Sequence, residues 1–586
     1  MPTGVRRWLT PAAWVAAVAA LLLAVFPVGF PNYDTIYALL WGRELGEGLD
    51  PDRGAALPPT PHPLAELFGL LTSPFGGGAI DLTMVVAYIS LGLVGYLVYR
   101  LGALWFDRPI GAVAALIVLT QAPFLSNGLR AYVDLPYIAL VLGALVIETK
   151  RPRAGWPVLA LLVPAGLLRP EAWLFSFAYL IYLQLDLKPA REDSAEPHEA
   201  SAKSGEAAER RPGAPLEPAD TQKRGLIRPR FVGARGAPGR TTAALAALTL
   251  AAPLLWAIYD WITAGSPTYS FTGTRETVET LGRHTGPIDL VLYGPRALGE
   301  VMQWPGMIGA LGGVILAIAL VRRRDRALRR HSDGIPGAAI GLAAAVLALG
   351  AFAILACAGL AIIARYTMLA GAILAIFVAL ALLGWRLLER GHPWRRAWQA
   401  FAAVVALMFV AWGPNQYDLL SQVDTDLTNQ GEIESDLGDL AESGAFQNVS
   451  RNSACAAGEH RTERGKDAGR PNSSAIRPTE DAAPRSVRRR QACETRSIPL
   501  CLPISVPNHR AVPRLAFDLE VRPSHIVSSS EQAHQPRRGY FLDPAGPFVI
   551  HNFILDPNDP SRFSTKVPPG FHRIAHNDSW RLYRRC

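Results

Sequence analysis

The side chains best suited to chemistry gather in residues 32–64. Asp34, Tyr37 and Trp41 are spaced i, i+3 and i+7, which places them along one face of a predicted helix. A carboxylate there can act as a general base that removes a proton from a hydroxyl group. Asp34 can equally be the N-cap of this helix and accept its amide hydrogen bonds. The other candidate residues of this stretch are Arg43 and the run His62-Pro63-Leu64.

Three further groups of charged or aromatic residues stand at the ends of apolar runs. They are Arg130 with Asp134, Arg169 with Glu171, and Arg365 with Tyr366. Arg365 is the sole charged residue between positions 337 and 385. Its guanidinium can bind a phosphate in bidentate fashion, or it can mark the boundary between two apolar runs and extend to the lipid headgroups. The residues alone leave both interpretations open.

Long apolar runs must position these residues. Half of the 586 residues are apolar, and runs of about twenty match the thickness of a bilayer's hydrocarbon core. This pattern excludes a simple soluble enzyme and, despite the net charge of +9, a nucleic-acid-binding protein. We expect an α-helical polytopic membrane protein with about eleven transmembrane helices, the first of which is not a cleaved signal peptide. The expected spans are 9–29, 82–104, 109–125, 132–148, 156–170, 172–187, 242–262, 306–321, 337–363, 367–385 and 398–413.

The orientation of the spans follows from the lysines and arginines of the short loops. With the N-terminus in the cytoplasm, the inner short segments hold 16 Lys/Arg in 46 residues, whereas the outer segments hold about eight in roughly 110. This arrangement predicts a multi-pass protein of the plasma membrane whose C-terminal part is extracytoplasmic. The strong excess of Arg over Lys favours a bacterial source.

Two regions lie outside the expected spans. Residues 188–241 are rich in Ala, Glu, Arg, Pro and Gly without apolar periodicity, and we expect a disordered cytoplasmic loop. The transmembrane domain, residues 1–413, is followed by a C-terminal domain, residues 414–586. This second domain should begin with a helix near 417–446 and continue, after low-complexity residues 451–492, as a small α/β or mostly β fold.

Disulfide bonds are permitted in an extracytoplasmic domain. Cys455, Cys493, Cys501 and Cys586 allow three pairings, and the sequence does not choose among them. We favour a bond between Cys501 and Cys586, with no disulfide at all as the alternative.

The motifs at the outer ends of the spans resemble those of membrane glycosyltransferases of the GT-C superfamily. The nearest group contains the dolichyl-phosphate-mannose protein mannosyltransferase-like and aminoarabinose transferase-like enzymes. Asp34-Thr35 stands where many members have Asp-Glu, and His62-Pro63-Leu64 stands where they have His-Pro-Pro-Leu. The runs 169–173, 265–270 and 365–366 also resemble bacterial members, and the resemblance covers about residues 9–413.

The resemblance implies transfer of a sugar from a polyprenyl-phosphate donor to an acceptor on the outer face of the membrane, in a GT-C-like fold. Asp34 would be the general base. Arg365, and after it Arg169 or Arg130, would offset the charge of the phosphate leaving group. Tyr37 and His62 would position sugar or phosphate. Arg43, Asp134, Glu171 and Tyr366 complete the predicted substrate site. Trp41 and Trp173 can stack on a sugar or, as is more common for tryptophans at the interface, belong to an aromatic belt.

Cofactors, partners and rival functions complete these expectations. We expect no cofactor and no metal site, because arginines can supply the cations; whether a divalent metal takes part stays open. The expected partners are the lipid-linked sugar and the membrane lipid, whereas the acceptor can be a protein, a lipid or a cell-wall glycan. One rival function is a transporter or flippase of lipid-linked sugars, and another is a non-catalytic membrane assembly protein.

Overall fold

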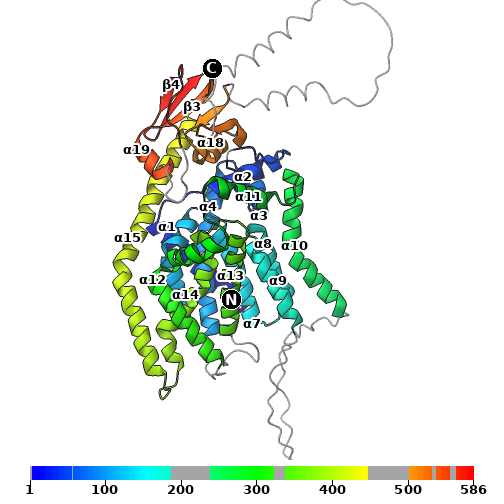
Figure 1. Ribbon diagram of the computed structural model, residues 1–586, viewed down its shortest axis with the longest axis vertical. Helices are drawn as coiled ribbons and strands as arrows, with labels where there is room; N and C mark the ends of the chain where they lie inside the picture. The colour runs from blue at the N-terminus through cyan, green and yellow to red at the C-terminus, as the bar shows by residue number, and fades with distance from the viewer. Residues whose placement is uncertain are drawn as a thin grey trace, which may run out of the picture.

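The computed structural model describes residues 3–55, 57–185, 238–322, 337–446, 501–530, 536–554 and 563–586. These residues form a bundle of apolar helices with a small sheet at one end of it (Figure 1). Most of the expected cytoplasmic loop, residues 188–237, and the low-complexity residues 451–492 lie outside the described residues, as do Cys455 and Cys493.

The helical part contains the following main helices: α1 (Thr3–Val25), α2 (Tyr33–Gly46), α3 (Pro63–Thr72), α4 (Gly78–Trp105), α5 (Arg108–Thr120), α6 (Ala122–Leu129), α7 (Asp134–Lys150), α8 (Trp156–Leu168), α9 (Glu171–Gln184), α10 (Pro238–Ala264), α11 (Tyr269–Thr280), α12 (Gly286–Arg322), α13 (Gly337–Cys357), α14 (Met368–Leu383) and α15 (Arg395–Glu442). Each of the eleven expected spans falls on one or two of these helices, which indicates a multi-pass membrane protein.

The count of eleven spans is not confirmed. Among the described residues, six helices are long and apolar enough to cross a membrane, or seven if the bent pair α5 and α6 is counted as one span. These two helices meet at an angle of 60°, because Pro123 at the start of α6 cannot continue the hydrogen-bond ladder of α5. Helices α7, α8 and α9 are only 17, 13 and 14 residues long.

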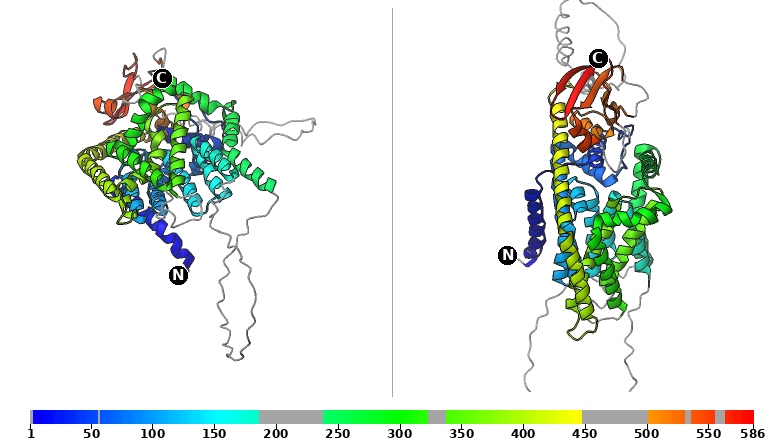
Figure 2. Two further views of the ribbon diagram at one scale, coloured as in Figure 1. Left: turned by 60° about the horizontal axis from the view of Figure 1, so that its bottom comes forward. Right: turned by 60° about the vertical axis from the view of Figure 1, so that its left-hand side comes forward.

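Helix α14 lies at the centre of the bundle. It carries apolar residues all round and is buried along nearly its whole length, in contact with α5, α12, α13 and α15. By contrast, α1 lies on the outside of the bundle, against α4 (Figure 2). The 3₁₀ turn Ala364–Thr367, which contains Arg365, enters α14 at the end of the bundle that also carries α2.

The C-terminal domain is an α/β unit. Its elements are β1 (Ile504–Val506), α18 (Val512–Asp518), β2 (Ile526–Ser528), β3 (Gly539–Pro544), α19 (Pro547–Val549), β4 (His572–His576) and β5 (Trp580–Arg585). The strand order is β2-β1-β3-β5-β4, in which β1 pairs in parallel with β2 and β3 and the other pairs are antiparallel. A disulfide joins Cys501 to Cys586, which confirms the favoured pairing.

The helix expected near 417–446 is the second half of α15, which runs without interruption from the bundle to the sheet (Figure 2). The apolar side of α2 packs into the same core as the end of α15 and the sheet. The segment between α1 and α4, which we call the first outer loop (residues 26–77) after its expected position, therefore shares one hydrophobic core with the C-terminal domain. This shared core fixes α2, and with it Asp34, relative to the sheet.

Candidate active site

Asp34 stands in the first turn of α2 but does not cap the helix. The cap is Asn32, whose side-chain oxygen accepts hydrogen bonds from the backbone amides of Asp34 and Thr35 at 2.8 and 3.3 Å. The interpretation of Asp34 as the N-cap is therefore wrong. Its carboxylate accepts instead from Arg365, with a distance of 3.0 Å between Nη1 and Oδ2.

Polar contacts hold the start of α2 in place. The side-chain amide of Asn32 donates to the backbone oxygen of Arg130 at 2.8 Å, and the hydroxyl of Thr35 donates to the backbone oxygen of Ala131 at 2.8 Å. Ala131 adopts a positive φ of 52°, which turns the chain between α6 and α7. Asp34 is thus positioned by a backbone segment almost one hundred residues away.

Arg365 reaches Asp34 from the turn before α14. Its guanidinium lies 5.1 Å from the ring centre of Tyr132 and 5.5 Å from that of Tyr366, so aromatic faces flank the cation. The Asp34 and Arg365 side chains are 22% and 23% exposed. The pair is therefore accessible from the pocket described below, although the protein covers most of it.

Arg169 forms a second, fully buried group of charges. Its Nη2 atom lies 3.2 Å from Oδ1 of Asp134 and 3.1 Å from Oε1 of Glu171. The ring of Tyr366 covers the guanidinium at 4.5 Å. Because two carboxyl groups already face its guanidinium, Arg169 has little capacity to bind a further anion.

His62 immediately precedes α3, where Pro63 takes the first helical position. Its ring is buried and packs edge-on against Trp256 with ring centres 5.9 Å apart. Burial, followed by the positive charges of Arg169 and Arg365, lowers the pKa of His62 to about 3, although Asp34 opposes the change. The imidazole is consequently neutral at physiological pH.

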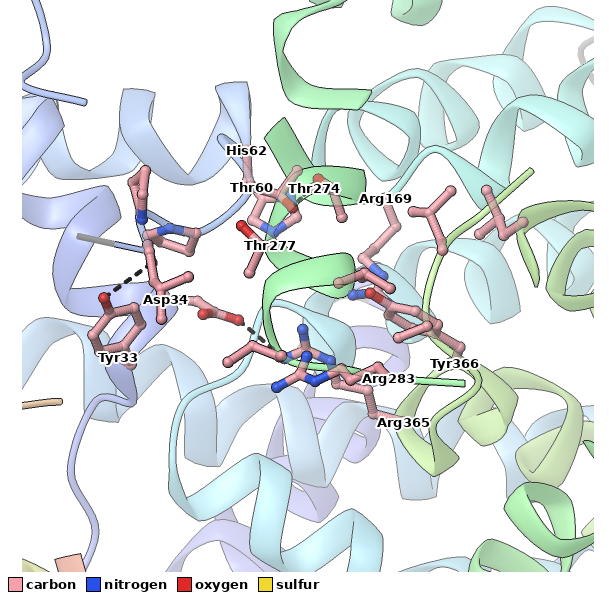
Figure 3. A pocket seen from close by; sticks show the side chains of 18 of the residues that line it. Tyr33, Asp34, Thr60, His62, Arg169, Thr274, Thr277, Arg283, Arg365 and Tyr366 are labelled. Carbon is pink, nitrogen blue, oxygen red and sulfur yellow. Dashed lines mark hydrogen bonds and ion pairs between the residues drawn. The ribbon is translucent and has the colours of Figure 1, made fainter. Parts of the chain in front are cut away.

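A pocket of about 140 Å³ lies between these groups (Figure 3). The predicted residues Asp34, His62, Arg169, Glu171, Arg365 and Tyr366 line it. Asp134 stands behind Arg169 and does not reach the pocket. One wall comes from α11 and the end of α13, which contribute apolar side chains such as Leu281 and Leu355. The pocket thus combines a charged side with an apolar side.

Other predicted residues lie away from this pocket. Tyr37 is fully buried between Tyr33 and Trp41 in the core shared with the C-terminal domain. Arg43 donates to the backbone oxygen of Phe517 in α18 at 3.2 Å. Arg130 binds the side chain of Gln430 in α15 at 3.0 and 3.1 Å.

Trp41 and Trp173, interpreted from the sequence as aromatic-belt residues or as sugar-stacking residues, have partners within the protein. The indole nitrogen of Trp41 donates to the backbone oxygen of Asp52 at 2.9 Å, and Arg53 covers the ring at 4.7 Å. The indole nitrogen of Trp173 donates to the backbone oxygen of Gly166 at 3.0 Å. Neither ring lines the pocket.

The sequence interpretation missed several lining residues. Arg283 enters from the segment after α11, and Thr274 and Thr277 come from α11 itself. Thr274 pairs with Thr60 at 2.5 Å between hydroxyl oxygens, which ties α11 to the first outer loop. The sequence could have indicated Arg283, because this arginine lies in a segment expected outside the membrane, whereas short loops rich in arginine are expected in the cytoplasm. The threonines carry no signal in the sequence.

The C-terminal domain also reaches the pocket. His509, just before α18, lies edge-on to Tyr33 with ring centres 5.5 Å apart, and both residues line the pocket. The described residues contain no group of three or more His, Cys, Asp or Glu side chains able to hold a metal ion.

No protein-family model matches the chain, and no curated protein matches it. Among solved structures, ArnT from Cupriavidus metallidurans bound to undecaprenyl phosphate is similar over 98% of each chain, with a TM-score of 0.46 and 11% identity. Archaeal oligosaccharyltransferase AglB from Archaeoglobus fulgidus, in complex with an inhibitory peptide and a dolichol-phosphate, is similar over 90% of this chain and 65% of its own, with a TM-score of 0.39 and 12% identity.

Proposed function

We propose that this protein is a membrane glycosyltransferase that moves a sugar from a polyprenyl-phosphate donor to an acceptor hydroxyl. One observation carries the proposal: the Asp34 carboxylate and the Arg365 guanidinium meet 3.0 Å apart on the wall of one pocket at the end of the bundle. A base and a phosphate-binding cation are the two groups that this reaction requires side by side.

In the proposed step, the acceptor oxygen attacks the anomeric carbon of the sugar. A new C–O bond forms, the bond between the anomeric carbon and the phosphate oxygen breaks, and its electron pair leaves on the lipid phosphate. The acceptor's proton passes to the Asp34 carboxylate. Because a single displacement occurs, the anomeric configuration inverts.

Arg365 has two roles in this proposal. Without donor it pairs with Asp34, and a bound phosphate competes with Asp34 for the guanidinium. The competition weakens the hold of Arg365 on the carboxylate, so donor binding makes Asp34 a better proton acceptor. Arg283 lines the same pocket and adds a second cation, whereas the two carboxylates around Arg169 offset its charge.

The proposal includes a topology. Helix α2 and the C-terminal domain lie at one end of the bundle (Figure 1). The pocket lies beside them, because Asp34 of α2 and His509 of the C-terminal domain line it. The arginine-rich short loops favour a cytoplasmic position for the other end, so transfer would occur at the outer face of the plasma membrane. The apolar pocket wall from α11 and α13 would face the lipid part of the donor.

The test is sugar transfer in membranes that contain the wild type, Asp34→Asn or Asp81→Asn. A panel of radiolabelled polyprenyl-phosphate sugars serves as donor, and label is followed into all acceptor fractions. Asp81→Asn is the matched control, because this exposed carboxylate lies at the start of α4, outside the pocket lining. We expect Asp34→Asn to lower transfer about 10²–10⁴-fold at unchanged protein level.

Two results would count against the proposal. Equal transfer by the wild type and Asp34→Asn would remove Asp34 from the reaction. Failure of every donor of the panel to bind the wild type would remove glycosyl transfer itself.

A further inference from the structure

The turn between α6 and α7 contacts both sides of the ion pair in the pocket. The backbone oxygen of Arg130 accepts hydrogen bonds from the backbone amide and the side-chain amide of Asn32, at 2.9 and 2.8 Å, two residues before Asp34. The ring centre of Tyr132 lies 5.1 Å from the guanidinium of Arg365. One short segment therefore holds the start of the helix that carries the carboxylate and also touches the cation.

Hydrogen bonds fix the backbone from which the Tyr132 ring projects. Ala131 has a φ of 52°, in the left-handed region that alanine rarely adopts. The backbone amides of Ala131 and Tyr132 donate to the backbone oxygens of Gly128 and Asn127 at 2.9 and 3.0 Å. The hydroxyl of Thr35 donates to the backbone oxygen of Ala131 at 2.8 Å. The turn is thus held from within and by α2.

Few bonds hold the guanidinium of Arg365. Among the described residues, Asp34 is its only hydrogen-bond partner, and its buried Nε atom has none. In the proposed function, a donor phosphate competes with Asp34 and removes that bond. The aromatic rings then remain as the protein contacts of the cation, because the negative face of a ring attracts a cation within about 6 Å of its centre.

The two rings beside this cation are not equivalent. The ring of Tyr366 lies 5.5 Å from Arg365 but 4.5 Å from Arg169, so it faces two cations. Tyr366 also belongs to the same 3₁₀ turn as Arg365, so it cannot fix that turn relative to α2. Tyr132 comes from a different segment, and this segment is bonded to the start of α2. Its ring can therefore hold Arg365 relative to Asp34.

We propose that Tyr132 is a positioning residue whose ring holds the Arg365 guanidinium beside Asp34 while the donor phosphate is bound. This inference rests on the proposed function. Tyr132 is not among the residues that line the pocket, so it acts through Arg365 and not by contact with the lipid.

The test measures binding of bare polyprenyl phosphate in detergent. Tyr132→Phe keeps the ring, whereas Tyr132→Leu removes it, and both are made in the wild type and in Arg365→Gln. Tyr182→Leu is the matched control, because the Tyr182 ring lies at a similar distance, 5.2 Å, from the guanidinium of Arg153. This second ring lies at the opposite end of α9 from the pocket residue Glu171.

We expect Tyr132→Leu to weaken binding of the lipid about 5- to 30-fold, whereas Tyr132→Phe and Tyr182→Leu should bind it like the wild type. In Arg365→Gln, Tyr132→Leu should cause no further loss, since substitutions that remove the same contact are not additive. An equal loss from Tyr132→Leu with and without Arg365 would give the ring a general structural role and overturn the inference.

A second series keeps the inference testable if Tyr132→Leu does not fold. Phenylalanines that carry one, two or three fluorine atoms at position 132 preserve the shape of the ring but reduce the negative charge of its face. The affinity for polyprenyl phosphate should fall with each added fluorine. An affinity that does not depend on the number of fluorines would overturn the inference. If neither bare polyprenyl phosphate nor any lipid-linked sugar binds the wild type, the proposed function itself fails, and this inference with it.

Discussion

Asp34 and Arg365 form an ion pair with 3.0 Å between Oδ2 and Nη1, although 331 residues separate them in the sequence. One comes from the first turn of α2, and the other from the turn that enters the central helix α14. The pocket is thus assembled from two elements that are each fixed by their own packing: α2 by the core that it shares with the C-terminal domain, and α14 by the helices around it.

Replacing Arg365 should weaken binding of the phosphate without unfolding the protein. We expect Arg365→Gln to weaken binding of bare polyprenyl phosphate about 10- to 100-fold, because hydrogen bonds to charged groups contribute about 1.5–3 kcal/mol. Arg365→Lys keeps the charge but loses the planar fork, so it should recover only part of the affinity. The measurement is lipid binding in detergent.

Arg296→Gln provides the control for this experiment, because Arg296 is an exposed residue of α12 that pairs only with Glu300 among the described residues. An unchanged affinity in Arg365→Gln would mean that the pair with Asp34 is structural and that the phosphate binds elsewhere.

The buried group around Arg169 should govern stability more than binding. Arg169→Met leaves Asp134 and Glu171 buried without a cation, and we expect a loss of about 3–5 kcal/mol in the free energy of unfolding. Combining Arg169→Met with Asp134→Asn and Glu171→Gln removes the uncompensated charges and should restore most of the thermal midpoint. Thermal unfolding in detergent measures both. A single variant as stable as the wild type would contradict this account.

The sequence alone was sufficient to identify the separate charges but not their pairing. Asp34, Arg169 and Arg365 stand out because charge at the end of an apolar run is unusual. Their partners cannot be read from periodicity, since the contacts join segments that are distant in the chain. The sequence also could not show that Asn32, two residues earlier, caps α2 and leaves the Asp34 carboxylate to Arg365.

Helix geometry explains why Arg43 does not reach the pocket. It follows Asp34 by nine residues, which is about two and a half turns at 3.6 residues per turn, so the two side chains leave α2 on opposite sides. Tyr37 lies on the nearer side, but α2 is buried almost all round by α3 and the C-terminal domain. The sequence predicted the C-terminal domain but not its contact with α2.

The count of eleven spans is not confirmed, for a physical reason. Hydropathy identifies apolar segments, and each expected segment is indeed helical. It does not distinguish a helix that crosses a bilayer from a short helix buried by its neighbours, such as the 13-residue α8. The break between α5 and α6 at Pro123 lies inside a run that reads as one continuous apolar segment.

Docking of the C-terminal domain on the first outer loop should depend on pH. Glu44 in α2 lies 3.4 Å from Arg522 and accepts from the backbone amide of Asp52 at 2.6 Å. Burial raises the pKa of Glu44 to about 7, against the lowering effects of the Asp52 amide and of Arg522 and Arg43; the charge of nearby Asp52 adds to the rise. The folded state therefore binds this proton more tightly than the unfolded state does.

The sign of the effect follows from that difference. The contribution of Glu44 to stability is fully present below about pH 4.5 and is lost as the pH rises through about 7. We expect the free energy of unfolding of the wild type to fall by at most about 3 kcal/mol between pH 5 and pH 8, and the thermal midpoint to fall with it. Glu44→Gln should flatten this dependence, whereas Glu432→Gln, which changes an exposed carboxylate of α15, should not. A profile of equal slope in Glu44→Gln would exclude Glu44 as the titrating group.

The bond between Cys501 and Cys586 should stabilise the C-terminal domain and report on its location. It joins a cysteine three residues before β1 to the residue that follows β5, with a sequence separation of 85. Its removal in Cys501→Ser is expected to cost about 2–4 kcal/mol and to increase proteolysis of the domain. Cys357→Ser, which replaces a free cysteine of α13, is the control.

The disulfide between Cys501 and Cys586 also reports on topology, because such a bond persists only in an oxidising compartment. In denatured samples prepared without reductant, Cys501 and Cys586 should therefore resist maleimide labelling and become reactive after reduction. Immediate labelling of both thiols would contradict the proposed extracytoplasmic position of the sheet and, because α2 shares its core, of the pocket that contains Asp34.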